Sequence, residues 1–400
     1  MPLPTSASEA GVRDPLFRLQ HYSFGAPSLP VLRALCSTSS QQDDGLIPHA
    51  FVLISGLGDT LGTLPYIARL AHLLSTRVEK DGRAWELLLP TLSSTAGGYG
   101  TASLEGDARE LGELVAFLRK EEKEEEEGGK QEQQQQGRRH IVIQGHSTGC
   151  QDLVQFLSEP RTGPFGVPSS SSSSSQGGSP LLHISAAILQ APVSDSEDFQ
   201  HRVAGAGAAQ HPSNKRAVEM LEMASKMVAE GRGHELLPRT HVAVLQPQHG
   251  APAWYTGARG ESIPSASDPI SEAPITAYRF HSLHSPGGDD DFFSSPALLP
   301  DAALRTSRLA QAIAQAEKQD TRLLFLFSAQ DQFVPEHLRA DEGAIRRNFL
   351  ERWEALQSDA GRAQGTVRGE VVPGADHAVH AEAAQELMLS HIDALLASLP

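Results

Sequence analysis

Short apolar runs and longer helical stretches alternate along this chain, and the alternation restricts the fold more than any other property. Runs rich in Val, Ile and Leu occupy residues 49–55, 85–89, 140–144, 184–190, 322–328 and 366–372. Helical stretches lie between them, at residues 64–74, 104–119, 150–157, 215–229, 344–356 and 381–397. The runs lack polar alternation, which is typical of parallel strands buried on both faces. The sequence therefore predicts an α/β fold with a mostly parallel central sheet and helices on both faces. Residues 17–23 and 31–34 could add an antiparallel edge.

The 400 residues are expected to form a single domain with three insertions. An acidic, Gln-rich tract at 120–139 and a Ser-rich tract at 161–180 cannot bury apolar surface, so both are predicted to be surface loops. Residues 192–304 are rich in Pro, Gly and Ser and contain one convincing helix. Such a stretch between two core strands is predicted to be a lid or cap.

Charge and cysteine content exclude several classes of protein. A net charge of −16 argues against nucleic acid as a partner, because phosphate binding needs a basic surface. Cys36 and Cys150 alone cannot form a disulfide framework or a multi-cysteine metal cluster. No apolar run approaches the ~20 residues that span a bilayer, and no signal peptide is evident. We expect a cytoplasmic protein without cofactor or metal, in which Asp289-Asp290-Asp291 is a solvated loop.

The motif Gly145-His146-Ser147-Thr148-Gly149 directly follows one predicted strand and precedes a predicted helix. Because a five-residue pattern can occur by chance, the main evidence for a catalytic serine is the position of the motif between a strand and a helix. A serine at such a tight turn adopts a strained backbone and presents its Oγ above the sheet. Glycines on either side are needed where strand and helix approach too closely for side chains. Ser147 is therefore the predicted nucleophile, and an ordinary serine in a βα turn is the alternative.

A serine hydroxyl needs a base to take its proton and an acid to orient that base. Asp331 and His377 each follow a later predicted strand, in the order Ser, Asp, His that this type of turn favours. They are the predicted acid and base. His380 is an alternative base and Asp195 an alternative acid, whereas Asp376 is expected to be a loop residue.

The segment Ser55-Gly56-Leu57-Gly58-Asp59-Thr60 follows the first predicted parallel strand. Together with the N-terminus of the helix after Ser147, it is expected to form an oxyanion hole. The predicted donors are the backbone N–H groups of Leu57 and Thr148, with Gly58 as the alternative to Leu57. A phosphate-binding turn is disfavoured, because the third glycine and the P-loop lysine are missing.

Several segments resemble an uncharacterised family of α/β-hydrolase-like proteins from fungi, algae and plants, catalogued as a domain of unknown function. The strongest likenesses are Gly145-His146-Ser147-Thr148-Gly149-Cys150-Gln151-Asp152 and Ile188-Leu189-Gln190-Ala191-Pro192-Val193-Ser194-Asp195. Weaker ones are Leu236-Leu237-Pro238-Arg239, Ile275-Thr276-Ala277-Tyr278-Arg279-Phe280 and Asp290-Asp291-Phe292-Phe293-Ser294-Ser295. The resemblance spans most of residues 51–377 and implies an α/β-hydrolase fold with Ser147, Asp331 and His377 as a triad. Ser55 departs from the pattern, since many hydrolases have histidine there.

The leading hypothesis is a serine hydrolase of esterase, lipase or thioesterase type, acting on a small-molecule acyl ester. Trp254 and Tyr255, with Phe292 and Phe293, are predicted to form apolar walls of its pocket. The alternative is a non-catalytic protein that keeps the fold and binds a ligand or partner, since fold alone does not establish activity. An acyltransferase or lyase is a third hypothesis. No feature of the sequence indicates an oligomeric state.

Overall fold

The structure is a computed structural model, and its core is an eight-stranded sheet. It describes residues 18–22, 29–35, 46–60, 62–128, 138–159, 161–162, 167–168, 182–204, 212–238, 274–357 and 366–400. The strand order is β1-β2-β4-β3-β5-β8-β9-β10. The bounds are β1 Arg18–Tyr22, β2 Leu29–Leu35, β3 His49–Ile54, β4 Trp85–Pro90, β5 Ile141–His146, β8 Ala186–Gln190, β9 Arg322–Ser328 and β10 Val367–Val372. The strands from β4 to β10 run parallel, and β1 and β2 form an antiparallel edge. The predicted α/β fold and its edge are confirmed.

The register of the central strands brings their carboxyl ends together. Ile54 pairs with Gly145, His146 with Gln190, and Gln190 in turn with Leu326. Each of these residues lies at or near the end of its strand. The loops that follow β3, β5, β8, β9 and β10 therefore meet at one edge of the sheet, where open α/β sheets bind ligands.

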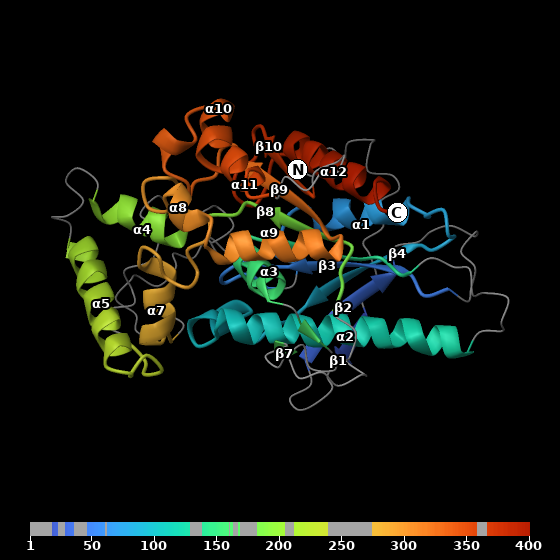
Figure 1. Ribbon diagram of the computed structural model, residues 1–400, viewed down its shortest axis with the longest axis horizontal. Helices are drawn as coiled ribbons and strands as arrows, with labels where there is room; N and C mark the ends of the chain where they lie inside the picture. Colours follow the sequence, from blue (N-terminus) through green and yellow to red (C-terminus); the bar gives the residue numbers. More distant parts are fainter. Residues whose placement is uncertain are drawn as a thin grey trace, which may run out of the picture.

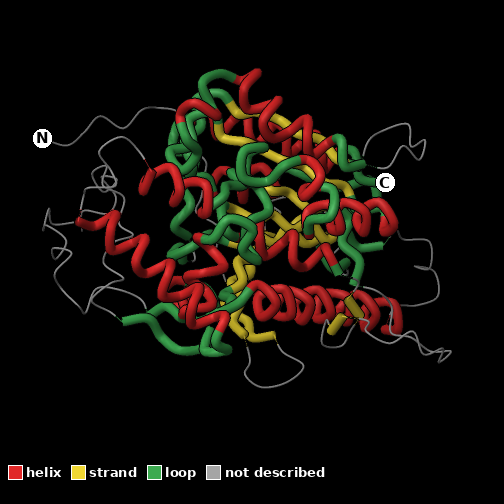
Figure 2. The backbone as a smooth tube through the Cα atoms, turned by 60° about the vertical axis from the view of Figure 1, so that its left-hand side comes forward, coloured by secondary structure: helices red, strands yellow, loops and turns green. Residues whose placement is uncertain are grey.

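Helices cover both faces of the sheet, each over its own apolar cluster (Figures 1 and 2). On one face lie α2 Leu104–Gly128, α3 Gly149–Ser158 and α9 Arg308–Gln319, and on the other α1 Ile67–Ser75 and α12 Glu382–Ala397. Helix α9 packs on α3 and is absent from the predicted helices, because two of its four buried apolar residues are alanine. None of the described helices is long and apolar enough to cross a membrane.

The predicted helix at 344–356 is divided into three pieces. Short helices α10 Glu342–Ile345 and α11 Glu351–Glu354 flank a π-helical turn at Arg346–Leu350. Trp353 in α11 is fully buried, and its ring lies 5.0 Å from that of Phe325 in β9. The helix is therefore interrupted where Trp353 packs closely against an aromatic side chain of the sheet.

The acidic tract at 120–139 is helical where it begins, so the predicted loop is wrong there. Helix α2 continues to Gly128, and residues 129–137 lie outside the described part. Glu121 pairs with Arg33 of β2 at 2.7 Å, and Glu122 pairs with Arg119 at 2.7 Å. Glu121 therefore ties α2 to the sheet, whereas the pair of Glu122 with Arg119 lies within the helix.

The Ser-rich stretch at 161–180 begins with a short antiparallel pair instead of a plain loop. Its strands are β6 Arg161–Thr162 and β7 Val167–Pro168. The serine run at 169–175 lies outside the described residues.

Residues 192–304 contain more helix than the single one predicted. The described part includes α4 Asp195–Ala204, α5 Pro212–Ala229, α7 Ala277–His284 and α8 Asp301–Leu304. Helices α4, α5 and α7 gather at one side of the core in Figure 1 and share a separate apolar cluster, with Phe199, Met220 and Phe280 at its centre. Helices α4 and α7 are short and rich in polar residues, which hides them in the sequence. Whether the whole stretch acts as a lid stays a prediction.

Candidate active site

Ser147 lies on a strained turn between β5 and α3. Its φ is +54°, in the left-handed region that residues other than glycine seldom adopt. A Cβ atom on Gly145 would lie 2.3 Å from the carbonyl oxygen of Gly149, and one on Gly149 would lie 2.9 Å from that of Ile54. Both glycines are therefore required by close backbone approach, as the sequence predicts. The turn leaves Ser147 9% exposed at the carboxyl edge of the sheet.

Asp331 and His377 form a buried, hydrogen-bonded pair. Asp331 follows β9 and His377 follows β10, and Oδ2 of Asp331 lies 2.7 Å from Nδ1 of His377. The other carboxylate oxygen of Asp331 accepts the backbone N–H of Phe333 at 3.0 Å. Gln332 Oε1 accepts the backbone N–H of His377 at 3.2 Å, and the Phe333 ring packs edge-on against the imidazole. These contacts fix the imidazole and leave its Nε2 for proton transfer.

The surroundings of His377 favour its charged form. Burial opposes the charge, but the Asp331 carboxylate and its hydrogen bond prevail, so the pKa of His377 is raised above its ordinary value. The negative charges of Asp59 and Asp195 act in the same direction. His377 is thus a stronger base than a free histidine.

Ser147 and His377 lie on neighbouring loops. Within the described part of the chain, Ser147 Oγ makes no hydrogen bond with His377, but the ring of His146 lies 4.9 Å from that of His377. Hydrogen bonds of catalytic groups are often long in structures without substrate and tighten when it binds. Proton transfer from Ser147 to His377 requires such a contact.

Gln190, at the end of β8, joins these loops, and the sequence does not single it out. Its side-chain oxygen accepts a hydrogen bond from Tyr66 OH at 3.2 Å and lies 2.5 Å from Nδ1 of His146. Its amide nitrogen donates to the carbonyl of His377 at 3.3 Å, and its own carbonyl accepts from the Ser147 N–H at 3.1 Å. The one sequence feature that could have indicated Gln190 is its position as a polar residue at the end of an apolar strand.

His146 is a packed residue and not a base. Burial, and then the charge on His377, lower the pKa of His146 to about 3 despite its contact with Gln190. The ring is therefore neutral at physiological pH and fills the space between the Ser147 turn and His377.

The backbone amides of Leu57 and Thr148, near Ser147, have no partner among the described residues. The Gly56 amide, by contrast, donates to Asp59 Oδ2 at 3.2 Å. Leu57 and Thr148 also line one cavity, whereas Gly58, the alternative donor, does not line it. Unpaired N–H groups on two residues that line one cavity, with Thr148 at the start of α3, can stabilise a developing oxyanion.

The cavity beside these amides is polar. Its other walls include Ser94, Thr95 and Tyr99, together with the charged residues Asp152 and Arg279. The aromatic walls expected from the sequence are not among the residues that line it. Trp254 and Tyr255 lie outside the described residues.

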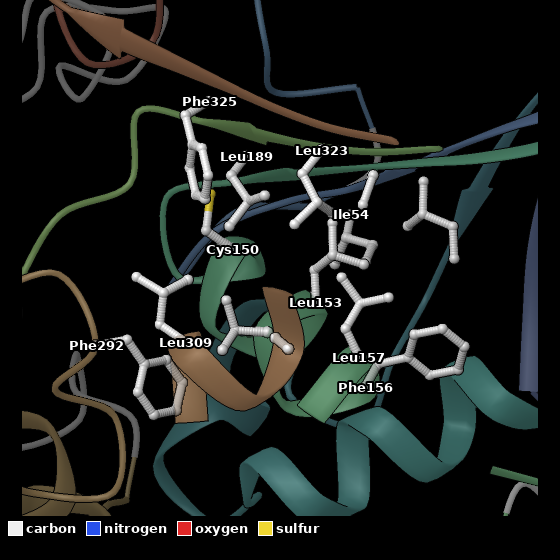
Figure 3. Close-up of a cluster of buried hydrophobic side chains, with 14 of the residues drawn as sticks. Ile54, Cys150, Leu153, Phe156, Leu157, Leu189, Phe292, Leu309, Leu323 and Phe325 are labelled. Atoms are coloured by element: carbon white, nitrogen blue, oxygen red, sulfur yellow. The ribbon is translucent and has the colours of Figure 1, made fainter. Parts of the chain in front are cut away.

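Phe292 and Phe293 belong to the apolar core. Phe292 is 3% exposed and lies in the cluster that also contains Leu309 and Cys150 (Figure 3). The Phe293 ring packs edge-on against Trp353, and Phe293 also lines a second cavity, whose walls are mostly apolar residues. Phe292 is thus a core residue instead of the predicted pocket wall.

The predicted solvated loop Asp289-Asp290-Asp291 is wrong for its last two residues, which are 2% and 6% exposed. Asp290 accepts a hydrogen bond from the Arg279 guanidinium at 2.6 Å and another from Ser282. Asp291 accepts from Ser194 at 3.0 Å. The acidic side chains hold together the segments on the α4 and α7 side of the site.

The alternative acid and base have other partners. His380 is exposed, and its Nδ1 lies 2.7 Å from Oδ2 of Asp376. Asp376 is therefore the partner of His380 and not of His377. Asp195 accepts a hydrogen bond from Gln151 at 3.4 Å. Burial, followed by the charges of nearby carboxylates, raises the pKa of Asp195 to about 7. Neither side chain replaces the pairing between Asp331 and His377.

The structure offers no metal site or reactive thiol beside Ser147 in the part that it describes. No group of three or more His, Cys, Asp or Glu side chains is arranged to hold a metal ion there. Cys150 points into the apolar core (Figure 3), and its Sγ donates to the Gly145 carbonyl at 3.2 Å. Burial raises the pKa of the Cys150 thiol well above its ordinary value, so the thiolate is disfavoured.

Several known proteins are similar to this chain in sequence and in fold. "Esterase AN6793" from Emericella nidulans is 31% identical over 83% of this chain and 81% of its own. "Fusarinine C esterase sidJ" from Aspergillus fumigatus is 28% identical over 83% of each chain. The solved structure of "Siderophore hydrolase EstB from Aspergillus fumigatus" covers 98% of both chains at 25% identity, with a TM-score of 0.65.

These likenesses show an α/β-hydrolase fold and an ester-bond hydrolase of the serine type. A family model described as "Protein of unknown function (DUF1749)" matches residues 33–397. The chain therefore belongs to the DUF1749 family.

Proposed function

We propose that the protein hydrolyses a small-molecule ester through a covalent acyl-enzyme intermediate formed on Ser147. The observation that carries this proposal is the Asp331–His377 pair beside a strained serine, with unpaired amides on two residues that line the neighbouring cavity. These features supply a base, a nucleophile and an oxyanion hole, the three requirements of acyl transfer to serine.

In the first half-reaction, His377 Nε2 takes the hydroxyl proton of Ser147 as Oγ attacks the ester carbonyl. The Leu57 and Thr148 amides stabilise the oxyanion. His377 then gives the proton to the leaving alcohol oxygen, and the carbon–oxygen bond of the ester breaks. Asp331 holds the Nδ1–H of the imidazole and stabilises the charge it gains.

In the second half-reaction, His377 activates a water molecule that attacks the acyl-enzyme. The acid is released and the Ser147 hydroxyl is regenerated. No cofactor enters either step. Free oxyanion amides and an oriented imidazole are what a catalyst needs, whereas the non-catalytic alternative gives them no role.

The substrate class to test first follows from the relatives, because one is named for fusarinine C and one for siderophores. Siderophore esters are therefore our leading candidates, with simple acyl esters for comparison. With only two cysteines, the chain also suits the reducing cytoplasm, where we place the activity.

Labelling with a fluorophosphonate probe tests the role of Ser147. We expect the parent protein to be labelled, Ser147→Ala to be unlabelled, and His377→Ala to be labelled far more slowly. His380→Ala is the matched control, because His380 is exposed and pairs with Asp376 instead of Asp331. Labelling that persists in Ser147→Ala would overturn the proposal.

A further inference from the structure

We propose that Asp59 is a positioning residue for the oxyanion hole, because its carboxylate fixes the turn that carries the Leu57 amide. Asp59 lies in the loop after β3 and takes no part in the proton transfers between Ser147 and His377. This inference rests on the proposed function of Ser147 and adds a residue on which the same reaction depends.

Residues 56–59 form a tight turn that Asp59 closes twice. The Asp59 N–H donates to the Gly56 carbonyl at 3.1 Å, and the Gly56 N–H donates to Asp59 Oδ2 at 3.2 Å. Gly58, the third residue of the turn, has a φ of +76°, as a type II turn requires at that position. The closing hydrogen bonds use the amides of Asp59 and Gly56. The amide of Leu57, the second residue, is therefore left for another acceptor.

The Asp59 residue is itself held in place. Its Oδ1 accepts a hydrogen bond from the Thr63 hydroxyl at 3.1 Å, and its backbone carbonyl accepts the N–H of Ala96, after β4, at 2.9 Å. Its Oδ2 lies 3.8 Å from Nε2 of His146, the residue before Ser147. Asp59 thus anchors the turn to two other segments at the carboxyl edge of the sheet.

The anchored turn lies directly against the nucleophile. A Cβ atom on Gly56 would lie 2.7 Å from Cβ of Ser147. Leu57 and Thr148 line a cavity of about 10 Å³, which has room for about one water-sized oxygen atom. Donors to an oxyanion must lie about 2.7–3.1 Å from it. A shift of the turn by about 1 Å would therefore take the Leu57 amide out of reach of the oxyanion.

Two substitutions separate the hydrogen bonds of Asp59 from its charge, which also acts on His377. In Asp59→Asn, the amide oxygen can still accept the Gly56 N–H. Its NH₂ group can donate to the Thr63 hydroxyl, which itself donates to the Thr60 carbonyl at 3.0 Å. Asp59→Asn therefore removes the charge and keeps the turn, whereas Asp59→Ala removes both.

A matched pair of esters measures the oxyanion hole itself. 4-Nitrophenyl butanoate and its thiono analogue differ only in the carbonyl atom, and sulfur accepts hydrogen bonds poorly. The quantity measured is the ratio of kcat/KM for the ester to that for the thionoester, divided by the same rate ratio for hydroxide. We expect the normalised ratio of the parent protein to be about 10²-fold or more, since only the oxygen anion is well stabilised by the amides.

Asp59→Ala should lower both activity and selectivity. We expect kcat/KM for the ester to fall by about 10²-fold and the normalised ratio by about 10-fold, because one donor is displaced. Asp59→Asn should keep the normalised ratio within about 2-fold of the parent value, because the turn is preserved.

Asp81→Ala is the matched control, because Asp81 has a similar environment at the opposite edge of the sheet. Its side chain is 19% exposed, against 22% for Asp59, and lies 3.4 Å from Nε2 of His49, the first residue of β3. It also accepts a backbone N–H, from Arg83 at 3.0 Å. Asp81→Ala should leave the normalised ratio unchanged. If Asp59→Ala fails to fold by circular dichroism, Thr63→Val supplies the test and should lower the ratio in the same direction.

Failure of this inference can be told apart from failure of the proposed function. A parent ratio retained in Asp59→Ala, or in Thr63→Val where it replaces that variant, would overturn the positioning role and leave the esterase intact. An equal loss of the ratio in Asp59→Asn and Asp59→Ala would also overturn it, because the charge would then be responsible. Absence of hydrolysis of both esters by the parent, together with absence of fluorophosphonate labelling, would instead overturn the proposed function.

Discussion

The protein surrounding Ser147 differs on its two sides. On the side of His377, hydrogen bonds hold each group in place, from Asp331 to the imidazole and from Gln190 to the His377 carbonyl. On the side of Leu57 and Thr148, the amides are unpaired, and the two residues line a small cavity together with the buried, charged Asp152 and Arg279. The first side is preorganised for proton transfer, whereas the second offers its unused groups to a substrate. Substitutions on the two sides should therefore have different consequences.

The largest effect is expected on the His377 side. Asp331→Asn should lower kcat by about 10⁴-fold, because an amide can donate to Nδ1 and favour the wrong imidazole tautomer. Steady-state kinetics on a simple acyl ester measures the loss. Asp376→Asn is the control, because Asp376 pairs with the exposed His380, and it should keep kcat within about 2-fold. Retention of more than a tenth of the parent activity in Asp331→Asn would refute the assigned acid.

A somewhat smaller loss of kcat is expected from a substitution next to the predicted oxyanion hole. A Cβ on Gly56 would lie 2.7 Å from Cβ of Ser147 and 3.2 Å from its Oγ. Gly56→Ala should therefore displace the nucleophile from the Leu57 and Thr148 amides and lower kcat by about 10²-fold.

Gly106→Ala is the control for this substitution, because Gly106 lies in α2 with a flexible side-chain atom of Ser103 as its nearest neighbour. It should leave kcat unchanged while folding normally by circular dichroism. Full activity in Gly56→Ala would show that Ser147 does not require this close approach.

Gln190 connects the two sides, so its loss should affect stability as well as rate. Gln190→Leu removes the partners of His146 Nδ1, Tyr66 OH and the His377 carbonyl. We expect kcat to fall by about 10-fold, and the free energy of unfolding to fall by about 1–3 kcal/mol for buried groups left unpaired. Urea denaturation and kinetics on the same preparation measure both. An unchanged kcat with reduced stability would make Gln190 a structural residue only.

The smallest effect expected is a shift in pH dependence that reports on the His377 side alone. Because Asp331 raises the pKa of His377, kcat/KM should rise with pH and reach its midpoint above pH 6.5. The charged imidazole stabilises the folded state below the unfolded pKa, and this contribution is lost as pH rises through the raised pKa. In Asp331→Asn the residual activity should have a lower midpoint. A parent midpoint below 6.5 would contradict the assigned base.

The groups on the His377 side could be predicted from sequence because they depend on local order. Uninterrupted apolar runs locate the strands, and β9 matches its predicted bounds of 322–328. In a parallel sheet, the loops after successive strands meet at one edge, so the residues that follow them come together. The order Ser147, Asp331, His377 then suffices to predict the pairing seen between the last two.

The polar cavity could not be predicted in this way. Asp290 has the sequence context of a solvated loop, and its burial depends on Arg279 and Ser282 in helix α7. Asp152 likewise lies in α3, whose periodicity suggests nothing about a cavity there. Burial of charged groups depends on tertiary partners, which neither composition nor spacing reveals.

The most direct test of the central claim is a crystal structure of the protein after reaction with a fluorophosphonate. The account predicts a phosphonyl group on Ser147 Oγ, with one oxygen about 2.7–3.1 Å from the amide nitrogens of both Leu57 and Thr148. His377 Nε2 should face the leaving-group position, with its bond to Asp331 intact. Modification at another residue, or a phosphonyl oxygen directed away from both amides, would contradict the account.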